Sequence, residues 1–132
     1  SMIPIATGEN EFQIHGFKQL LERQAVDVIM PDIGRVGGIQ ETKNICVLAE
    51  SYGVPVSPHN YSSGILLAAT IHLMASTPNT MWLEMDMSQN AVYDELLCEP
   101  LQFNNSCITI PQCVGLGVQL PSETLKNYLI QS

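Results

Sequence analysis

Four polar side chains follow short apolar runs at nearly regular intervals along this sequence. Glu9, Asp32, His59 and Glu84 are separated by 23, 27 and 25 residues. Histidine is the side chain best suited to transfer a proton near neutral pH, and a nearby aspartate can fix its tautomer by accepting its second N–H. Glutamate oxygens are ligands that suit Mg²⁺. A base beside a divalent cation is what is needed to remove the weakly acidic proton next to a carboxylate.

Each of these residues is a candidate for one role. His59 is the candidate base, and Asp32 is its orienting partner. Glu84 is a candidate proton donor or substrate ligand, and Glu9 is a candidate Mg²⁺ ligand. Weaker candidates for contact with a substrate are Asn10, Arg35 and Asn60. Taken singly, each has an ordinary explanation as a cap, turn or loop residue, so it is the shared position that favours function.

Extended and helical segments alternate ahead of these residues. We expect strands over residues 3–6, 26–30, 54–57 and 81–83, and helices over 11–23, 39–51 and 63–75. Residues 32–38 are expected to form a glycine-rich loop. This alternation predicts a parallel sheet, in which the strand ends gather at one edge. The four polar residues should therefore lie close together.

The pattern changes after residue 84. Residues 86–99 have no clear period. Two short strands are expected at 101–103 and 107–110 around a turn, and a last helix over about 123–130 is expected to be capped by Ser122.

The composition limits the classes of function. The chain has 132 residues, of which 45% are hydrophobic, enough for one domain with a core. Its net charge of −8 disfavours nucleic acid and anionic membranes as partners. No apolar run reaches the roughly 18 residues that a bilayer span needs. The low charged fraction of 14% suggests that another chain or further sequence covers part of the surface.

The cysteines give no metal-binding pattern. Their spacing matches no zinc site, and we expect Cys46 to be a core residue. Because no signal peptide precedes them, we expect reduced thiols and a cytoplasmic location. Ser1 before Met2 is typical of a cloning remnant, so the natural chain is expected to begin at Met2. The four cysteines are Cys46, Cys98, Cys107 and Cys113.

Together these motifs resemble the mandelate racemase branch of the enolase superfamily, over about residues 3–130. The motifs that carry the resemblance are Gly8-Glu9-Asn10, Pro31-Asp32 followed by Val36-Gly37-Gly38, Ser57-Pro58-His59 and Trp82-Leu83-Glu84. Leu83 to Ser88 and Asp94 to Leu97 look closest to the sugar-acid dehydratases and lactone cycloisomerases. A lysine would replace Asp32 in the muconate lactonizing branch.

The resemblance implies a fold and a chemistry. The fold would be α/β, a partial (β/α) TIM-type barrel of about four βα units. Residues 1–100 would form this half-barrel, and residues 101–132 a C-terminal return segment of two strands and a helix. His59 and Asp32 would move the α-proton, Glu84 would face the substrate's carboxylate, and Glu9 would be the third Mg²⁺ carboxylate. Two other carboxylates, a lysine base and the substrate-selecting loops have no counterpart in the sequence.

Two functions follow from these expectations. In the first, the chain is the C-terminal half of a Mg²⁺-dependent sugar-acid dehydratase, racemase or cycloisomerase, inactive until the missing half is supplied. In the second, it is a non-catalytic half-barrel whose open edges pair with another copy and which binds a ligand or partner. A start at Met2 favours the second.

Overall fold

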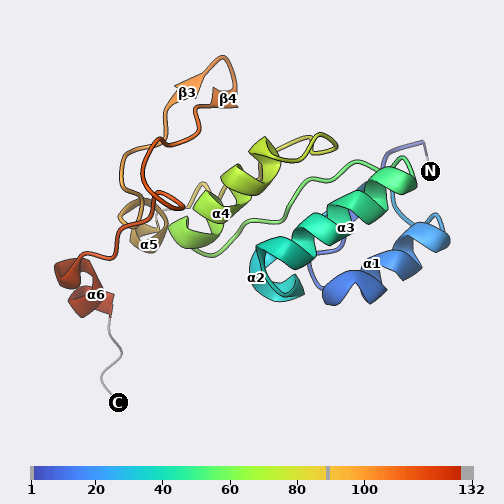
Figure 1. Ribbon diagram of the computed structural model, residues 1–132, viewed down its shortest axis with the longest axis horizontal. Coiled ribbons are helices and arrows are strands. Elements are labelled where there is room, and N and C mark those ends of the chain that lie inside the picture. The colour runs from blue at the N-terminus through green and yellow to red at the C-terminus, as the bar shows by residue number, and fades with distance from the viewer. Residues whose placement is uncertain (1, 89, 129–132) are drawn as a thin grey trace.

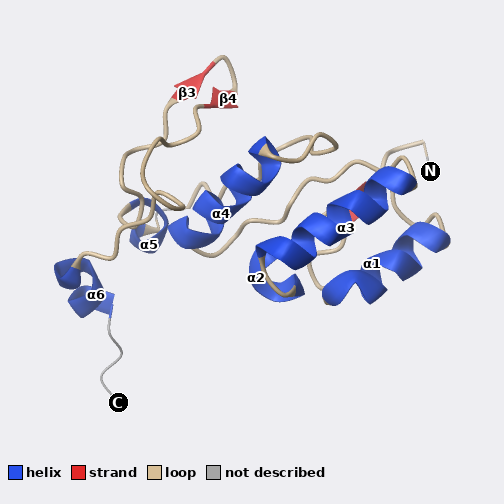
Figure 2. Ribbon diagram, viewed as in Figure 1, coloured by secondary structure: helices blue, strands red, loops and turns tan. Residues whose placement is uncertain are grey.

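Three long helices alternate with short extended segments in the N-terminal part of the molecule (Figures 1 and 2). The structure is a computed structural model that describes residues 2–88 and 90–128. The elements are β1 (Ala6–Thr7), α1 (Gln13–Glu22), β2 (Val28–Ile29), α2 (Ile33–Val36), α3 (Ile39–Ser51), α4 (Gly64–Ala75), α5 (Ala91–Asp94), β3 (Phe103–Asn104), β4 (Cys107–Ile108) and α6 (Ser122–Tyr128).

The predicted parallel sheet is present, but it is much less regular than expected. β1 pairs with β2 in parallel, with Ala6 opposite Val28. Beyond β2 the pairing continues as single parallel bridges, from Ile29 to Val56 and from Val56 to Thr80. The expected third and fourth strands are therefore reduced to bridges. Proline lacks an N–H for the ladder, and the third segment contains Pro55 and is directly followed by Pro58.

The main core lies between these extended segments and the helices. Phe17 and Leu21 of α1 pack there because residues four apart share one helix face, and Ile45 and Ala49 of α3 do the same. All four are at most 2% exposed. α1 and α3 run side by side along one edge of the molecule (Figure 1). The predicted helix over 39–51 is confirmed with the same bounds, and the one predicted over 11–23 is confirmed as the slightly shorter α1.

Helix α4 is buried on two sides, which explains its almost wholly apolar sequence. Leu66 and Leu73 belong to the main core, whereas Leu67 and Ile71 form a second cluster with Tyr93 of α5. The side chain of Ser63 accepts a hydrogen bond from the Leu66 N–H and so caps the helix. The predicted helix over 63–75 is thus confirmed as a core helix.

Residues 32–38 are not the loop that the glycines predicted. They contain the one-turn helix α2, which Asp32 caps by accepting a hydrogen bond from the Gly34 N–H at 2.8 Å. Gly37 ends this helix with φ 119°, a conformation that favours glycine. The glycines mark the end of a helix, so the loop prediction was wrong.

After residue 84, α5 packs against α4, whereas the β3–β4 hairpin and α6 extend away from the three long helices (Figure 1). β3 and β4 form the expected hairpin, with Phe103 opposite Ile108. The short helix α5 lies within residues 86–99, which had no predicted structure. α6 begins at Ser122, and the predicted end of the last helix at residue 130 lies outside the described residues.

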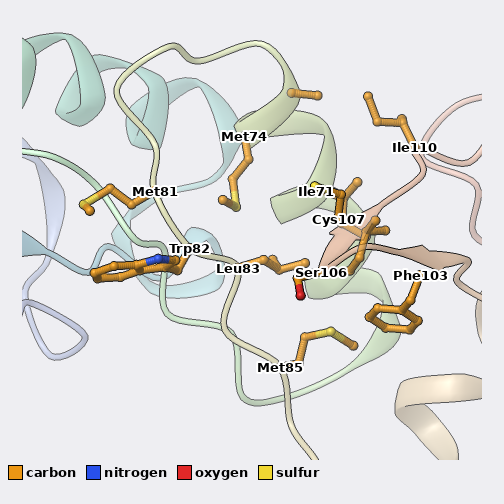
Figure 3. Close-up of a pocket in the computed structure, with 12 residues that line it drawn as sticks. Ile71, Met74, Met81, Trp82, Leu83, Met85, Phe103, Ser106, Cys107 and Ile110 are labelled. Atoms are coloured by element: carbon orange, nitrogen blue, oxygen red, sulfur yellow. The ribbon is translucent and has the colours of Figure 1, made fainter.

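The hairpin also helps to enclose an apolar pocket of about 580 Å³ beside α4. Leu83 and Met85 point toward the hairpin, whereas Trp82 points the other way (Figure 3). Within residues 2–88 and 90–128, no helix has both the length and the hydropathy needed to cross a membrane.

A disulfide bond joins the two ends of the hairpin segment. It links Cys98 to Cys113, so the expectation of reduced thiols is wrong for this pair. Backbone pairing between Leu97 and Val118 brings the two chain segments together next to the bond. Cys46 and Cys107 are free thiols, buried and exposed respectively. Sequence spacing alone gave no sign of this pairing, because it depends on how the chain returns after the hairpin.

Candidate functional site

The predicted base and its partner lie at neighbouring ends of the parallel segments. Asp32 follows β2 and His59 follows the bridge at Val56. Asp32 and His59 themselves form a parallel bridge, and the His59 N–H donates to the Pro31 carbonyl at 3.1 Å. Backbone pairing therefore brings together two side chains that are 27 residues apart in the sequence.

The two side chains form a close pair. His59 Nδ1 lies 2.8 Å from Asp32 Oδ2, and the other oxygen of Asp32 accepts from the Gly34 N–H. The Asp32 side chain is only 6% exposed, and that of His59 is 18% exposed. An ionised carboxylate can only accept hydrogen bonds, so Nδ1 carries a proton and Nε2 is left as the proton-accepting atom. This is the arrangement that a histidine base requires.

Glu84 lies on the open side of the imidazole. Its Oε2 is 4.0 Å from His59 Nε2 and accepts a hydrogen bond from the Asn60 N–H at 2.8 Å. The Ser57 hydroxyl donates to the Trp82 carbonyl at 2.8 Å and joins the third extended segment to the fourth. Glu84 is thereby placed at the same edge as the histidine and aspartate, as the sequence predicted.

A second carboxylate lies close to Glu84 in the chain. Asp86 accepts hydrogen bonds from Ser88, including one from its N–H at 2.8 Å. These bonds, above all the one from the Ser88 side chain, hold the pKa of Asp86 below its usual value. Asp86 therefore remains ionised at neutral pH.

Glu9 lies in a tight turn that follows β1. Gly8 has φ 133°, and a Cβ added there would lie 2.9 Å from the Phe17 ring, so only glycine fits. The Glu9 carboxylate accepts from the Gly8 N–H at 3.3 Å and from Asn10 Nδ2 at 3.1 Å. The turn thus holds Glu9 next to the end of β1, where the sequence predicted it.

Arg35 connects this turn to the aspartate. Its Nη1 donates to Asn10 Oδ1 at 3.0 Å, and its Nε lies 3.9 Å from Asp32 Oδ2. Arg35, which lies in α2, thus links the turn at Asn10 to Asp32, and it stays a candidate substrate contact. Asn60, by contrast, is fully buried, with its side chain engaged by protein groups, so in this structure it offers no surface to a substrate.

The described residues do not by themselves fit a Mg²⁺ ion. Mg²⁺ keeps its waters unless several oxygen ligands replace them, and Glu9 offers a single carboxylate. In residues 2–88 and 90–128, the metal-ligating side chains that converge in a group of three are Cys98, Glu99 and Cys113, and two of these are joined as a disulfide. Glu9 would need further carboxylates from elsewhere, as the sequence analysis expected.

Two features of the site had no sequence signal. The Tyr93 hydroxyl contacts Asn60, and it comes from a segment whose pattern predicted no element. The hydrogen bond of the Asn60 N–H to Glu84 also could not be predicted, because backbone donors carry no mark in a sequence. Both bonds join residues that are far apart in the sequence.

Comparison with known proteins gives a consistent picture. The family model described as enolase C-terminal domain-like matches residues 1–124. The chain is 39% identical over 128 residues to the D-xylonate dehydratase of Haloferax volcanii, covering 97% of this chain and 31% of the relative. It is 34% identical to the D-galactarolactone cycloisomerase of Agrobacterium fabrum, covering 96% of this chain and 35% of the relative. The chain therefore spans about a third of the curated relatives that it matches.

Solved structures agree with the sequence relatives. The 3,6-anhydro-D-galactonate cycloisomerase of Zobellia galactanivorans superposes with a TM-score of 0.90 at 36% identity, over 99% of this chain and 37% of that one. A member of the enolase superfamily from Polaromonas sp. JS666 gives a TM-score of 0.90 at 30% identity, over 98% of this chain and 35% of that one. The fold is thus a partial TIM-type barrel, as predicted. The chain belongs to the enolase C-terminal domain-like family, in the mandelate racemase branch of the enolase superfamily.

Proposed function

We propose that this chain supplies the histidine base of an enzyme that removes the proton next to the carboxylate of a sugar acid. The observation that carries the proposal is the His59–Asp32 pair at 2.8 Å, with Glu84 4.0 Å from the free Nε2. The dehydratase and cycloisomerase relatives support the substrate class. Because the chain spans about a third of those relatives, we propose that activity requires the rest of the barrel.

In this proposal His59 Nε2 takes the α-proton of the substrate, and the C–H electron pair moves into the carboxylate to give an enediolate. Throughout this step Asp32 accepts a hydrogen bond from the His59 Nδ1–H, and its negative charge stabilises the imidazolium that forms. Glu84 hydrogen-bonds the substrate near this centre. Members of the superfamily typically use Mg²⁺, which would stabilise the enediolate's charge. Glu9 would be one of its ligands, and the proton would move directly from the substrate to His59 Nε2.

A chimaeric enzyme tests this function. Residues 2–128 would replace the matching third of the H. volcanii D-xylonate dehydratase, and formation of the 2-keto-3-deoxy acid from D-xylonate would be followed. We expect activity with His59 and a loss of about 10²-fold or more in His59→Asn, the range typical of a general base. His15→Asn, at an exposed position on α1, is the matched control. A folded chimaera that works equally well with His59→Asn would refute the proposal.

The alternative function, a self-assembling half-barrel, also has an observation in its favour. Apolar side chains are exposed at both edges of the sheet: Ile5 is 44% exposed, Met81 is 45% exposed and Trp82 is 64% exposed. We propose that a complementary barrel half or a second copy covers them. Native mass spectrometry of this chain separates the two: a stable dimer favours self-assembly, and a monomer that binds only the first-half chain favours the enzyme.

A further inference from the structure

We infer that Tyr93 is a positioning residue for Glu84, and that it acts through Asn60. The inference rests on the proposed function, because it concerns how Glu84 is held next to His59. Tyr93 lies in α5 and is not one of the residues at the strand ends. Its hydroxyl is not hydrogen-bonded to the side chains of His59, Asp32 or Glu84 in the contacts described above. Its hydroxyl instead contacts the residue that fixes the Glu84 carboxylate.

The link consists of hydrogen bonds that join the buried Asn60 to the buried Tyr93 and to the partly exposed Glu84. Asn60 Nδ2 donates to the Tyr93 hydroxyl at 3.0 Å and to the Glu84 carbonyl at 3.0 Å. The Asn60 N–H donates to Glu84 Oε2 at 2.8 Å. Asn60 is 0% exposed and Tyr93 is 3% exposed, so the bond between their side chains is shielded from water. Asn60 therefore holds Glu84 at both its backbone and its carboxylate.

The hydroxyl of Tyr93 also joins two separate loops. Besides Asn60, it accepts a hydrogen bond from the Asp86 N–H at 3.3 Å. The loop at residues 59–60 and the loop at residues 84–86 thus meet at one oxygen atom. His59 directly precedes Asn60 in the chain. The Tyr93 hydroxyl therefore helps to set the distance between His59 Nε2 and Glu84 Oε2, which is 4.0 Å.

The ring of Tyr93 contributes to core packing, whereas its hydroxyl makes hydrogen bonds. The ring packs against Leu67 and Ile71 of α4 in the second core cluster, and phenylalanine would fill that space equally well. Among the described residues, the Asn60 side-chain oxygen has no hydrogen-bond partner, so the amide group is held by its Nδ2 bonds alone. Removing the hydroxyl therefore takes away one of the two bonds that orient this side chain.

Nuclear magnetic resonance can separate positioning from packing without any substrate. The probe is the backbone amide of residue 60, whose proton shift should follow the ionisation of Glu84 between pH 3 and 8. Glu84→Gln identifies that response by abolishing it, which separates it from the ionisation of His59 and Asp86. We expect Tyr93→Phe to reduce the response by half or more, and Asn60→Ala to do the same. Tyr52→Phe, at an exposed tyrosine after α3, is the matched control and should leave it unchanged.

The outcomes decide the inference independently of catalysis. An unchanged response in folded Tyr93→Phe and Asn60→Ala overturns it, and so does a failure of both variants to fold, since the role would then be one of stability. In an active chimaera, Tyr93→Phe should lower kcat about 10-fold with KM changed less than about 2-fold, because misplacement of a reacting group acts on the chemical step. An inactive chimaera with a positive amide result would refute the proposed function but not the positioning.

Discussion

The disulfide between Cys98 and Cys113 gives a stability prediction whose size can be worked out. The bond closes a loop of sequence separation 15 that contains β3 and β4. Closing a loop of this length removes conformational entropy from the unfolded chain that is equivalent to about 3 kcal/mol at 25 °C. We therefore expect Cys98→Ser to lower the free energy of unfolding by about 3 kcal/mol. For a chain of this length, that corresponds to a fall of about 10 °C in Tm.

Two assays check this prediction. First, the denatured protein without reductant should show two reactive thiols, rising to four after reduction. Second, thermal unfolding should give a lower Tm for Cys98→Ser, and Cys113→Ser should match it. Cys107→Ser is the control, because Cys107 is exposed and free. Reduction should lower the Tm of the control and leave Cys98→Ser unchanged.

Either of two results would refute the reasoning. Four reactive thiols in the unreduced, denatured protein would mean that the bond is not formed in solution. A Tm for Cys98→Ser equal to that of Cys107→Ser would mean that the hairpin segment unfolds separately from the rest. In the second case, the Leu97–Val118 pairing beside the bond would not be coupled to the main core.

Two further predictions concern single residues of the N-terminal part. Burial raises the pKa of the Cys46 thiol to about 11, so iodoacetamide at pH 8 should modify Cys107 and spare Cys46 in the folded protein. The unfolded thiol ionises at lower pH, so the free energy of unfolding should be unaffected by this group below about pH 8 and should fall as the pH rises toward 11. A free energy of unfolding that stays constant over this range in denaturant titrations would contradict this. Gly8→Ala should destabilise the fold by about 1–3 kcal/mol, because its Cβ would lie 2.9 Å from the Phe17 ring and φ is 133°. Gly53→Ala, with φ 69° and open space, should cost less in the same chemical denaturation experiment.

The sequence predicted the order of elements well, because the helices carry strong periodic patterns. α1, α3 and α4 lie where the apolar spacing placed them. The edge that gathers Asp32, His59 and Glu84 was also predictable, since parallel segments all end on the same side. Both results rest on local patterns combined with one rule of topology.

The failures have a common physical cause. The disulfide and the bonds of Tyr93 depend on contacts between segments far apart in the chain. No local pattern records such contacts. The roles of Glu9, Asn10 and Arg35 toward a metal or substrate stay predictions, as do a cytoplasmic location and the division at residue 100.

The burial of α4 on two sides has a consequence for how this chain tolerates change. Leu66 and Leu73 belong to one cluster, while Leu67 and Ile71 belong to the other, so a cavity made at any of these four positions disturbs a core cluster. A shorter chain that ends before α5 would lose Tyr93 and leave Leu67 and Ile71 with fewer apolar neighbours. Trimming the sequence back to its parallel segments would therefore expose apolar surface and give a fragment that aggregates. Recombination points for protein engineering are better chosen outside residues 64–97.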